Sequence, residues 1–201
     1  RDAELALLSS VLETPRAARP IIVIHGPGGV GKTALIDAAG SLSSGVRKEW
    51  VSLDASAVPP VLPVVEGALS PALCAENVVV RIDSYERLSH LDEWFRKSFV
   101  PRLSETALVL ITSRNPPADE WLANPLVEVV ALRNLDPKAC FDYLDRLGVD
   151  PRLRADIVAR THGHPLALAL VADRARRSGE VEPAVVRPRC CALSSRMCRH
   201  R

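Results

Sequence analysis

The chain has 201 residues, which is enough for one domain of ordinary size and a second, smaller domain. Residues 1–186 carry 21 basic and 24 acidic groups, because five arginines lie in residues 187–201, and a mildly acidic body gives no electrostatic reason to expect direct contact with nucleic acid. The five cysteines show no disulfide framework, which indicates a reducing, cytoplasmic compartment, and no apolar run approaches the roughly 18 residues that would indicate a membrane.

The first part of the chain alternates between predicted helices and predicted strands. Apolar residues at helical spacing predict a helix over residues 2–13, and residues 14–19 are expected to form a linker. Short apolar runs rich in β-branched residues predict five strands, at residues 21–24, 49–53, 77–82, 108–112 and 127–131. Between the strands we predict helices at residues 33–39, ending near Gly40, at 64–69, around 88–95 with one apolar face, and at 119–122.

The second part of the chain is predicted to contain helices alone, at residues 136–147, 151–162 and 165–177. Strands that alternate with helices, followed by helices without strands, predict an α/β domain with a parallel sheet at residues 1–134 and a small helical domain at residues 135–180. Residues 181–201 lack periodicity and are rich in cysteine and arginine, so we expect a disordered or non-native tail there.

One loop fits the phosphate-binding P-loop pattern G-x-x-x-x-G-K-[ST], between a predicted strand and a predicted helix. Its glycines let backbone N–H groups point at phosphate oxygens, its lysine reaches the β- and γ-phosphates, and its hydroxyl coordinates Mg²⁺. The helix that follows adds its positive N-terminal end. The alternative is a glycine-rich turn without a ligand. The residues predicted to bind nucleotide in this loop are Gly26, Pro27, Gly28, Gly29, Val30, Gly31, Lys32, Thr33 and Ala34.

The strand at residues 77–82 runs directly into Asp83, as in the metal-holding Walker B strand of P-loop proteins. We expect Asp83 to bind Mg²⁺ beside Thr33. The alternative is a helix N-terminus, because Asp83 and Glu86 also fit a capping box. Ser84 stands where many P-loop ATPases carry a second acid, so Glu86 is the nearest carboxylate for activating water, unless it only caps the helix or faces solvent.

Two further parts of the sequence are distinctive. Arg114 follows the fourth strand, and ligands of parallel sheets lie at the carboxyl ends of strands, so Arg114 is expected to contact the γ-phosphate, with a surface ion pair as the alternative. Together with Lys32 and Glu86 it forms the predicted catalytic set. Gly163 and Pro165 separate two predicted helices, and a plain helix–helix corner is the simplest reading of that stretch.

Taken together, these segments resemble the STAND class of P-loop NTPases, which is related to AAA+ ATPases and includes NB-ARC-like ATPases and the ATPase modules of bacterial transcriptional regulators. The matching segments are residues 1–5, 26–33, 78–83, 108–114 and 163–166. The resemblance implies an α/β P-loop NTPase fold with a parallel five-stranded sheet in the order 5-1-4-3-2, followed by a small helical domain. It also implies ATP or ADP with Mg²⁺ as cofactors.

The resemblance further assigns roles to single residues. Pro165 would pack near the adenine, Arg114 would be a first-sensor arginine, and Arg1 would belong to an N-terminal segment that also lines the base. Two residues depart from the class. Ser84 replaces the second acid, which argues against fast hydrolysis, and Arg81 puts a charge into a strand expected to be buried on both faces.

The expected function is that of an ATP-binding regulatory module with slow Mg²⁺-dependent hydrolysis that acts as a conformational switch. The first alternative is a nucleotide-binding scaffold that does not hydrolyse, and the second is a P-loop kinase acting on a small molecule. The chain begins with Arg1 rather than Met, so other domains of a longer parent chain are expected partners beside nucleotide, with self-association left open. No membrane partner is expected.

Overall fold

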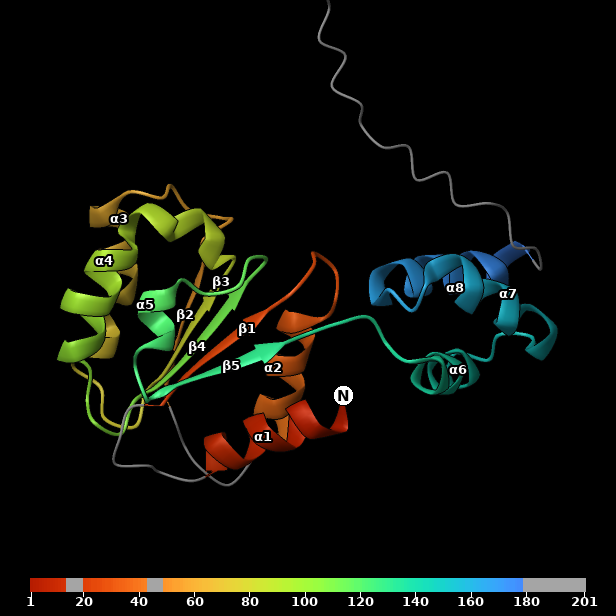
Figure 1. Ribbon diagram of the computed structural model, residues 1–201, viewed down its shortest axis with the longest axis horizontal. Helices are drawn as coiled ribbons and strands as arrows, with labels where there is room; N and C mark the ends of the chain where they lie inside the picture. Colours follow the sequence, from red (N-terminus) through yellow and green to blue (C-terminus); the bar gives the residue numbers. More distant parts are fainter. Residues whose placement is uncertain (14–19, 43–48, 179–201) are drawn as a thin grey trace, which may run out of the picture.

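A parallel sheet forms the centre of the protein (Figure 1), in a computed structural model that describes residues 1–13, 20–42 and 49–178. Its strand order is β2-β3-β4-β1-β5, and every neighbouring pair is parallel. The predicted order 5-1-4-3-2 is therefore confirmed. The strands are β1 (Ile21–His25), β2 (Trp50–Asp54), β3 (Val79–Asp83), β4 (Leu108–Ser113) and β5 (Val127–Ala131).

The side chains of the central strands alternate between two hydrophobic clusters, one on each face of the sheet. In β1, Ile21 and Val23 enter one cluster while Ile22 and Ile24 enter the other. All six residues of β4 are buried, whereas the edge strand β2 buries only every second residue. A strand covered on both faces needs a continuous apolar run, and this explains why the sequences of β1 and β4 show no polar alternation.

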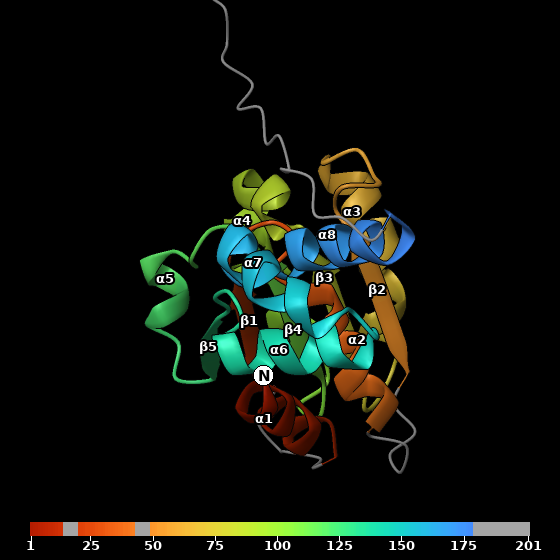
Figure 2. The ribbon, with the colours of Figure 1, turned by 90° about the vertical axis from the view of Figure 1, so that its right-hand side faces the viewer.

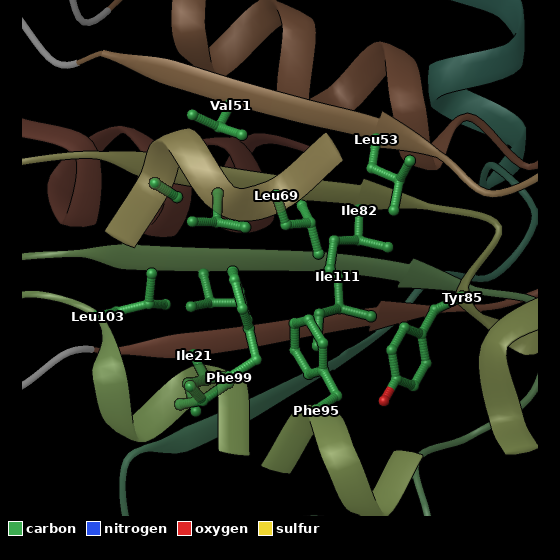
Figure 3. Packing of buried hydrophobic residues seen from close by; sticks show 14 of the residues in the cluster. Ile21, Val51, Leu53, Leu69, Ile82, Tyr85, Phe95, Phe99, Leu103 and Ile111 are labelled. Atoms are coloured by element: carbon green, nitrogen blue, oxygen red, sulfur yellow. The ribbon is translucent and has the colours of Figure 1, made fainter. Parts of the chain in front are cut away.

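Helices cover both faces of the sheet. The helices α1 (Asp2–Glu13) and α2 (Lys32–Leu42) contribute to the cluster that contains Ile22 and Ile24. The opposite face is covered by α3 (Leu62–Leu69), by the helical segment 85–102 and by α5 (Asp119–Leu122). Figure 3 shows Phe95 and Phe99 on this face, pointing toward the strands, with their rings stacked at 5.2 Å.

Two details of the predicted helices are wrong. The helix after the P-loop continues through Gly40 to Leu42, so Gly40 does not end it. The segment expected to be one regular helix around residues 88–95 is a series of short pieces. They are a 3₁₀ segment Tyr85–Leu91, α4 (Asp92–Trp94), a π-helical turn Phe95–Phe99 and a 3₁₀ turn Val100–Arg102. The predicted apolar face exists nonetheless, because Leu88 and Phe95 are both buried.

After β5 the chain forms α6 (Pro137–Arg146), α7 (Pro151–Thr161) and α8 (Pro165–Ser178), as predicted. Each helix begins with proline, and the side chains of Asp136 and Asp150 accept backbone N–H groups at the starts of α6 and α7. These helices share a hydrophobic cluster of their own, which includes Cys140, Ile157 and Leu168. They lie beyond the end of the sheet toward which β5 points, and in front of the sheet in Figure 2.

The division into domains at residues 134 and 180 remains a prediction, and the expected linker at residues 14–19 and tail at 181–201 lie outside the described residues. Among the helices of the described ranges, none combines the length and the apolar character that crossing a membrane requires.

Candidate nucleotide-binding site

The P-loop lies between the end of β1 and the start of α2. The backbone N–H of Gly26 donates to the Ser113 carbonyl at 3.2 Å, which joins the loop to the end of β4. The Lys32 ammonium donates to the carbonyl oxygens of Gly26 at 2.7 Å and Pro27 at 3.0 Å, so the side chain folds back over its own loop. Burial lowers the pKa of Lys32, against the opposing effect of Glu86 and with a further lowering by Arg114.

Asp83 lies beside the start of α2, as the sequence predicted. Its Oδ1 accepts a hydrogen bond from the Thr33 hydroxyl at 3.2 Å and a second one from the Thr112 hydroxyl. Its Oδ2 accepts two hydrogen bonds from Arg81. The alternative capping role is wrong, because the helical segment after β3 begins at Tyr85 and its N-cap is Ser84, which lies in the left-handed region with φ 59° and makes no side-chain capping bond. A carboxylate and a hydroxyl at this spacing are suitable oxygen ligands for Mg²⁺.

Glu86 and Arg114 form a pair next to the P-loop. The Arg114 backbone N–H donates to Oε2 of Glu86 at 3.1 Å, and its guanidinium Nε lies 3.3 Å from Oε1. Glu86 is 17% exposed and Arg114 is 70% exposed. The guanidinium also flanks the loop tip, since a Cβ built on Gly28 would lie 3.6 Å from it. The structure thus brings together two of the three predicted catalytic side chains, and it also realises the alternative interpretation of Arg114 as a member of an ion pair.

The N-terminal end of α8 contacts the P-loop directly. His164 Nε2 donates to the Gly28 carbonyl at 2.9 Å, and the Leu166 N–H donates to the Gly29 carbonyl at 3.3 Å. The Ala167 N–H donates to His164 Nδ1, which fixes the tautomer with the proton on Nε2. Gly29 has φ +76°, and a Cβ there would lie 2.9 Å from the Leu166 side chain, so only glycine allows this approach.

Arg1 and Pro165 occupy different parts of the surroundings. The Arg1 guanidinium donates to the carbonyl oxygens of Val30 at 2.9 Å and Arg133 at 2.7 Å, and so connects α1 to the P-loop and to the segment after β5. A cavity of about 200 Å³ opens beside Arg1, next to Asn134 and Asp136. Pro165 begins α8 and is half-buried, but it is not among the residues that line this cavity. Their expected adenine contacts stay predictions.

Sequence reasoning missed three contributors to the site. Thr112 carries a buried hydroxyl at the end of an otherwise apolar strand, and a polar residue at that position could have indicated a contact with the site. Asp37 lies four residues after Thr33 on α2, hence on the same helix face, and pairs with Arg81 at 2.6 Å. His164 lies next to the glycine–proline corner that the sequence did single out. A separate cavity of about 320 Å³ borders Glu86 on the side of Trp121 and contains no P-loop residue among its lining.

Comparisons with known proteins agree with this architecture. The AAA ATPase domain family matches residues 1–180. One similar solved structure is a Signal Transduction ATPase with Numerous Domains (STAND) protein with a tetratricopeptide repeat sensor from Pyrococcus horikoshii. It has 19% identity and a TM-score of 0.55, and the match covers 86% of this chain and 29% of that one.

Two further similar structures contain DNA. The replication initiator DnaA, bound to AMPPCP and single-stranded DNA, has 18% identity and a TM-score of 0.61, over 87% of this chain and 60% of that one. Drosophila ORC bound to DNA has 12% identity and a TM-score of 0.63, over 90% and 57%. The chain therefore spans less than two thirds of each of these proteins, and identities this low show a shared fold alone. No curated protein matches the chain.

The family match over most of the chain, the five-stranded parallel sheet and the complete P-loop lead to one conclusion: the chain belongs to the AAA ATPase domain family of P-loop NTPases.

Proposed function

We propose that this chain is an ATP-binding regulatory module that hydrolyses ATP slowly with Mg²⁺ and works as a conformational switch. The observation that carries the proposal is the direct contact of the P-loop carbonyls of Gly28 and Gly29 with His164 and Leu166 at the start of α8. A phosphate chain in the P-loop would lie against backbone that α8 also touches. Binding there would therefore bias the position of α6–α8, provided that nucleotide interacts differently with the two positions.

The residues divide the binding task by their positions. Lys32 would leave the carbonyls of its own loop and pair with the β- and γ-phosphates, while the loop N–H groups bind the remaining oxygens. Thr33 and Asp83 would hold Mg²⁺, which neutralises charge on the phosphates when bound. Arg1 and Pro165 are the proposed contacts to the adenine.

Glu86 and Arg114 are proposed to control hydrolysis. Glu86 would orient a water and accept its proton, and Arg114 would stabilise charge on the γ-phosphate. In the structure the Arg114 guanidinium pairs with Glu86 and also flanks Gly28. Activation of water and stabilisation of the γ-phosphate would therefore involve the same ion pair. Moving Arg114 toward a γ-phosphate would weaken its hold on Glu86, so the two residues would respond to ATP together. Slow turnover fits the absence of a carboxylate at position 84.

A second candidate function is a nucleotide-binding scaffold without hydrolysis. The observation that favours it is Glu86 itself, which is already engaged by both the backbone and the side chain of Arg114. The two candidates differ in one measurement, the release of phosphate from ATP in the presence of Mg²⁺ by a protein that demonstrably binds ATP.

The experiment that tests the proposal measures binding, turnover and conformation on one preparation. Titrations with ATP, ADP and GTP should show preference for adenine nucleotides, and phosphate release should depend on Mg²⁺. Spectroscopic probes at Ser41 on α2 and Arg176 on α8 should report a nucleotide-dependent distance, with a probe pair at Ser41 and Glu66, both next to the sheet, as the control. Binding without any change in the first distance would contradict the switch.

A further inference from the structure

Arg81 is a charged residue inside the sheet, two positions before Asp83 in β3. Its strand neighbours Val80 and Ile82 belong to the cluster under the helical segment 85–102, so Arg81 points to the opposite face, where α2 packs. The side chain is only 17% exposed. A guanidinium this far from water requires compensation by hydrogen-bonded acids, so its partners identify its role.

Those partners connect Arg81 to both proposed metal-binding elements. Its Nη1 pairs with Oδ1 of Asp37 at 2.6 Å, and its Nη2 and Nε donate to Oδ2 of Asp83 at 2.7 and 3.2 Å. Asp37 lies one helical turn after Thr33, on the helix that starts with Lys32. Arg81 therefore connects the Asp83 carboxylate to the helix that carries the P-loop lysine and threonine.

The two carboxylate oxygens of Asp83 have different hydrogen-bond partners. Oδ2 is occupied by Arg81, whereas Oδ1 faces the hydroxyls of Thr33 and Thr112. A carboxylate without the first contact could turn about its terminal torsion, which has a broad energy profile. Together with the hydroxyls of Thr33 and Thr112, the contact therefore fixes the torsion angle at which one of the two equivalent oxygens points to Thr33.

We propose that Arg81 is a positioning residue that presents Oδ1 of Asp83 to the Mg²⁺ of a bound nucleotide. This inference rests on the proposed function, because Asp83 must be the metal-holding acid. The positive charge of Arg81 by itself would repel Mg²⁺, but Asp37 neutralises it, so the orientation of Asp83 is the larger effect. Groups that orient metal ligands typically contribute ten- to a hundredfold to metal affinity.

The test measures the Mg²⁺ concentration at which ATP stabilises the protein against thermal unfolding. Arg81→Met should raise that midpoint about tenfold and leave the binding of ATP in EDTA unchanged. Arg81→Lys keeps the charge but loses the two-point contact with Asp83. Its Mg²⁺ midpoint should therefore be raised nearly as much as that of Arg81→Met. Arg154→Met is the matched control, since Arg154 is 18% exposed and pairs with Asp145 at 2.7 Å among the helices after β5. It should lower stability without changing the Mg²⁺ midpoint.

The outcomes separate this inference from the proposed function. If the parent protein shows no Mg²⁺-dependent binding of ATP, both are overturned. If the parent protein binds ATP in a Mg²⁺-dependent manner, an unchanged or lower Mg²⁺ midpoint in Arg81→Met overturns only the positioning role of Arg81. A parent-like midpoint in Arg81→Lys overturns it as well.

If Arg81→Met does not fold, the variants Asp37→Asn and Arg81→Lys test the positioning role. Asp37 is 59% exposed, and its loss should raise the midpoint, because Arg81 then lacks the partner that neutralises its charge and holds its guanidinium in place. Parent-like midpoints in both variants would refute the inference.

Discussion

The Thr33 hydroxyl and Oδ1 of Asp83 lie 3.2 Å apart although the two residues are separated by 50 positions in the sequence. The strand order explains how they meet. Strand β4 lies between β1 and β3, so a contact from the P-loop after β1 to the end of β3 must pass the end of β4. Thr112 occupies that position and donates to the same oxygen of Asp83. The three side chains form the part of the site where we expect Mg²⁺.

Removing the P-loop lysine should weaken nucleotide binding. Lys32→Ala loses a charged partner of the β- and γ-phosphates, which costs about 1.5–3 kcal/mol, or about ten- to a hundredfold in the Kd for ATP. The measurement is a calorimetric titration, with Lys97→Ala as the control because Lys97 is 66% exposed and pairs with Glu93 on the surface. If the folded Lys32→Ala variant bound ATP as tightly as the parent, the assignment of this loop as the phosphate-binding site would be wrong.

Two acidic residues should affect different steps. Asp83→Asn should lower the Mg²⁺-dependent part of ATP affinity and turnover together, because Asp83 lies at Thr33. Glu86→Gln should lower turnover at least tenfold while ATP still binds, since general-base groups typically contribute about 10²–10⁴-fold. Single-turnover phosphate release and equilibrium binding distinguish the two. Parent-like hydrolysis by Glu86→Gln would show that Glu86 only holds Arg114.

The two proposed nucleotide contacts outside the P-loop should differ in their dependence on the third phosphate. Arg114→Ala should weaken ATP more than ADP, because only ATP carries the γ-phosphate that Arg114 is proposed to reach from beside Gly28. Pro165→Ala should weaken ATP and ADP equally, because both carry adenine. Parallel titrations with the two nucleotides check this. Equal losses for ATP and ADP in Arg114→Ala would contradict its role as a sensor.

Asp92 should be the acid on which the stability of the segment 85–102 depends most. It accepts hydrogen bonds from the Tyr85 hydroxyl at 2.7 Å, the Trp121 indole at 2.6 Å and Arg96 at 2.7 Å. Asp92→Ala leaves these donors without their acceptor, so we expect a loss of about 2–4 kcal/mol in the free energy of unfolding. Its exposed neighbour Glu93, which pairs with Lys97 in the same i,i+4 arrangement, is the control, and Glu93→Ala should leave the stability close to that of the parent. Urea titrations measure both.

The same carboxylate should make stability depend on pH. Burial disfavours ionised Asp92, but the hydrogen bonds from Tyr85, Arg96 and Trp121 outweigh burial and lower its pKa below 3.8. A depressed pKa contributes stability that is present above the unfolded-state pKa and is lost as the pH falls through the folded-state pKa. Stability of the parent should therefore fall below about pH 4 more steeply than that of Asp92→Asn. Equal slopes for the two proteins in acid would exclude this contribution.

The sequence by itself determined the features that depend on neighbouring residues. Apolar runs rich in β-branched residues predicted the five strands. The runs of β1 and β4 are continuous because these strands are covered on both faces, whereas the edge strand β2 alternates. The P-loop followed from residues spaced within eight positions, and the start of α8 followed from Pro165. The strand order came from resemblance to a known class rather than from any local pattern, and the structure confirms it.

The tertiary structure alone decided which distant side chains meet. Arg81 looked like a charge in the wrong strand, and only the packing of α2 on β3 gives it Asp37 as a second partner. Glu86 and Arg114 form a pair because the ends of β3 and β4 are adjacent. The contact of His164 with Gly28 spans 136 positions and depends on how α8 turns toward the P-loop. Local periodicity specifies which face of an element is apolar, but the partner across that face is fixed only when the elements pack.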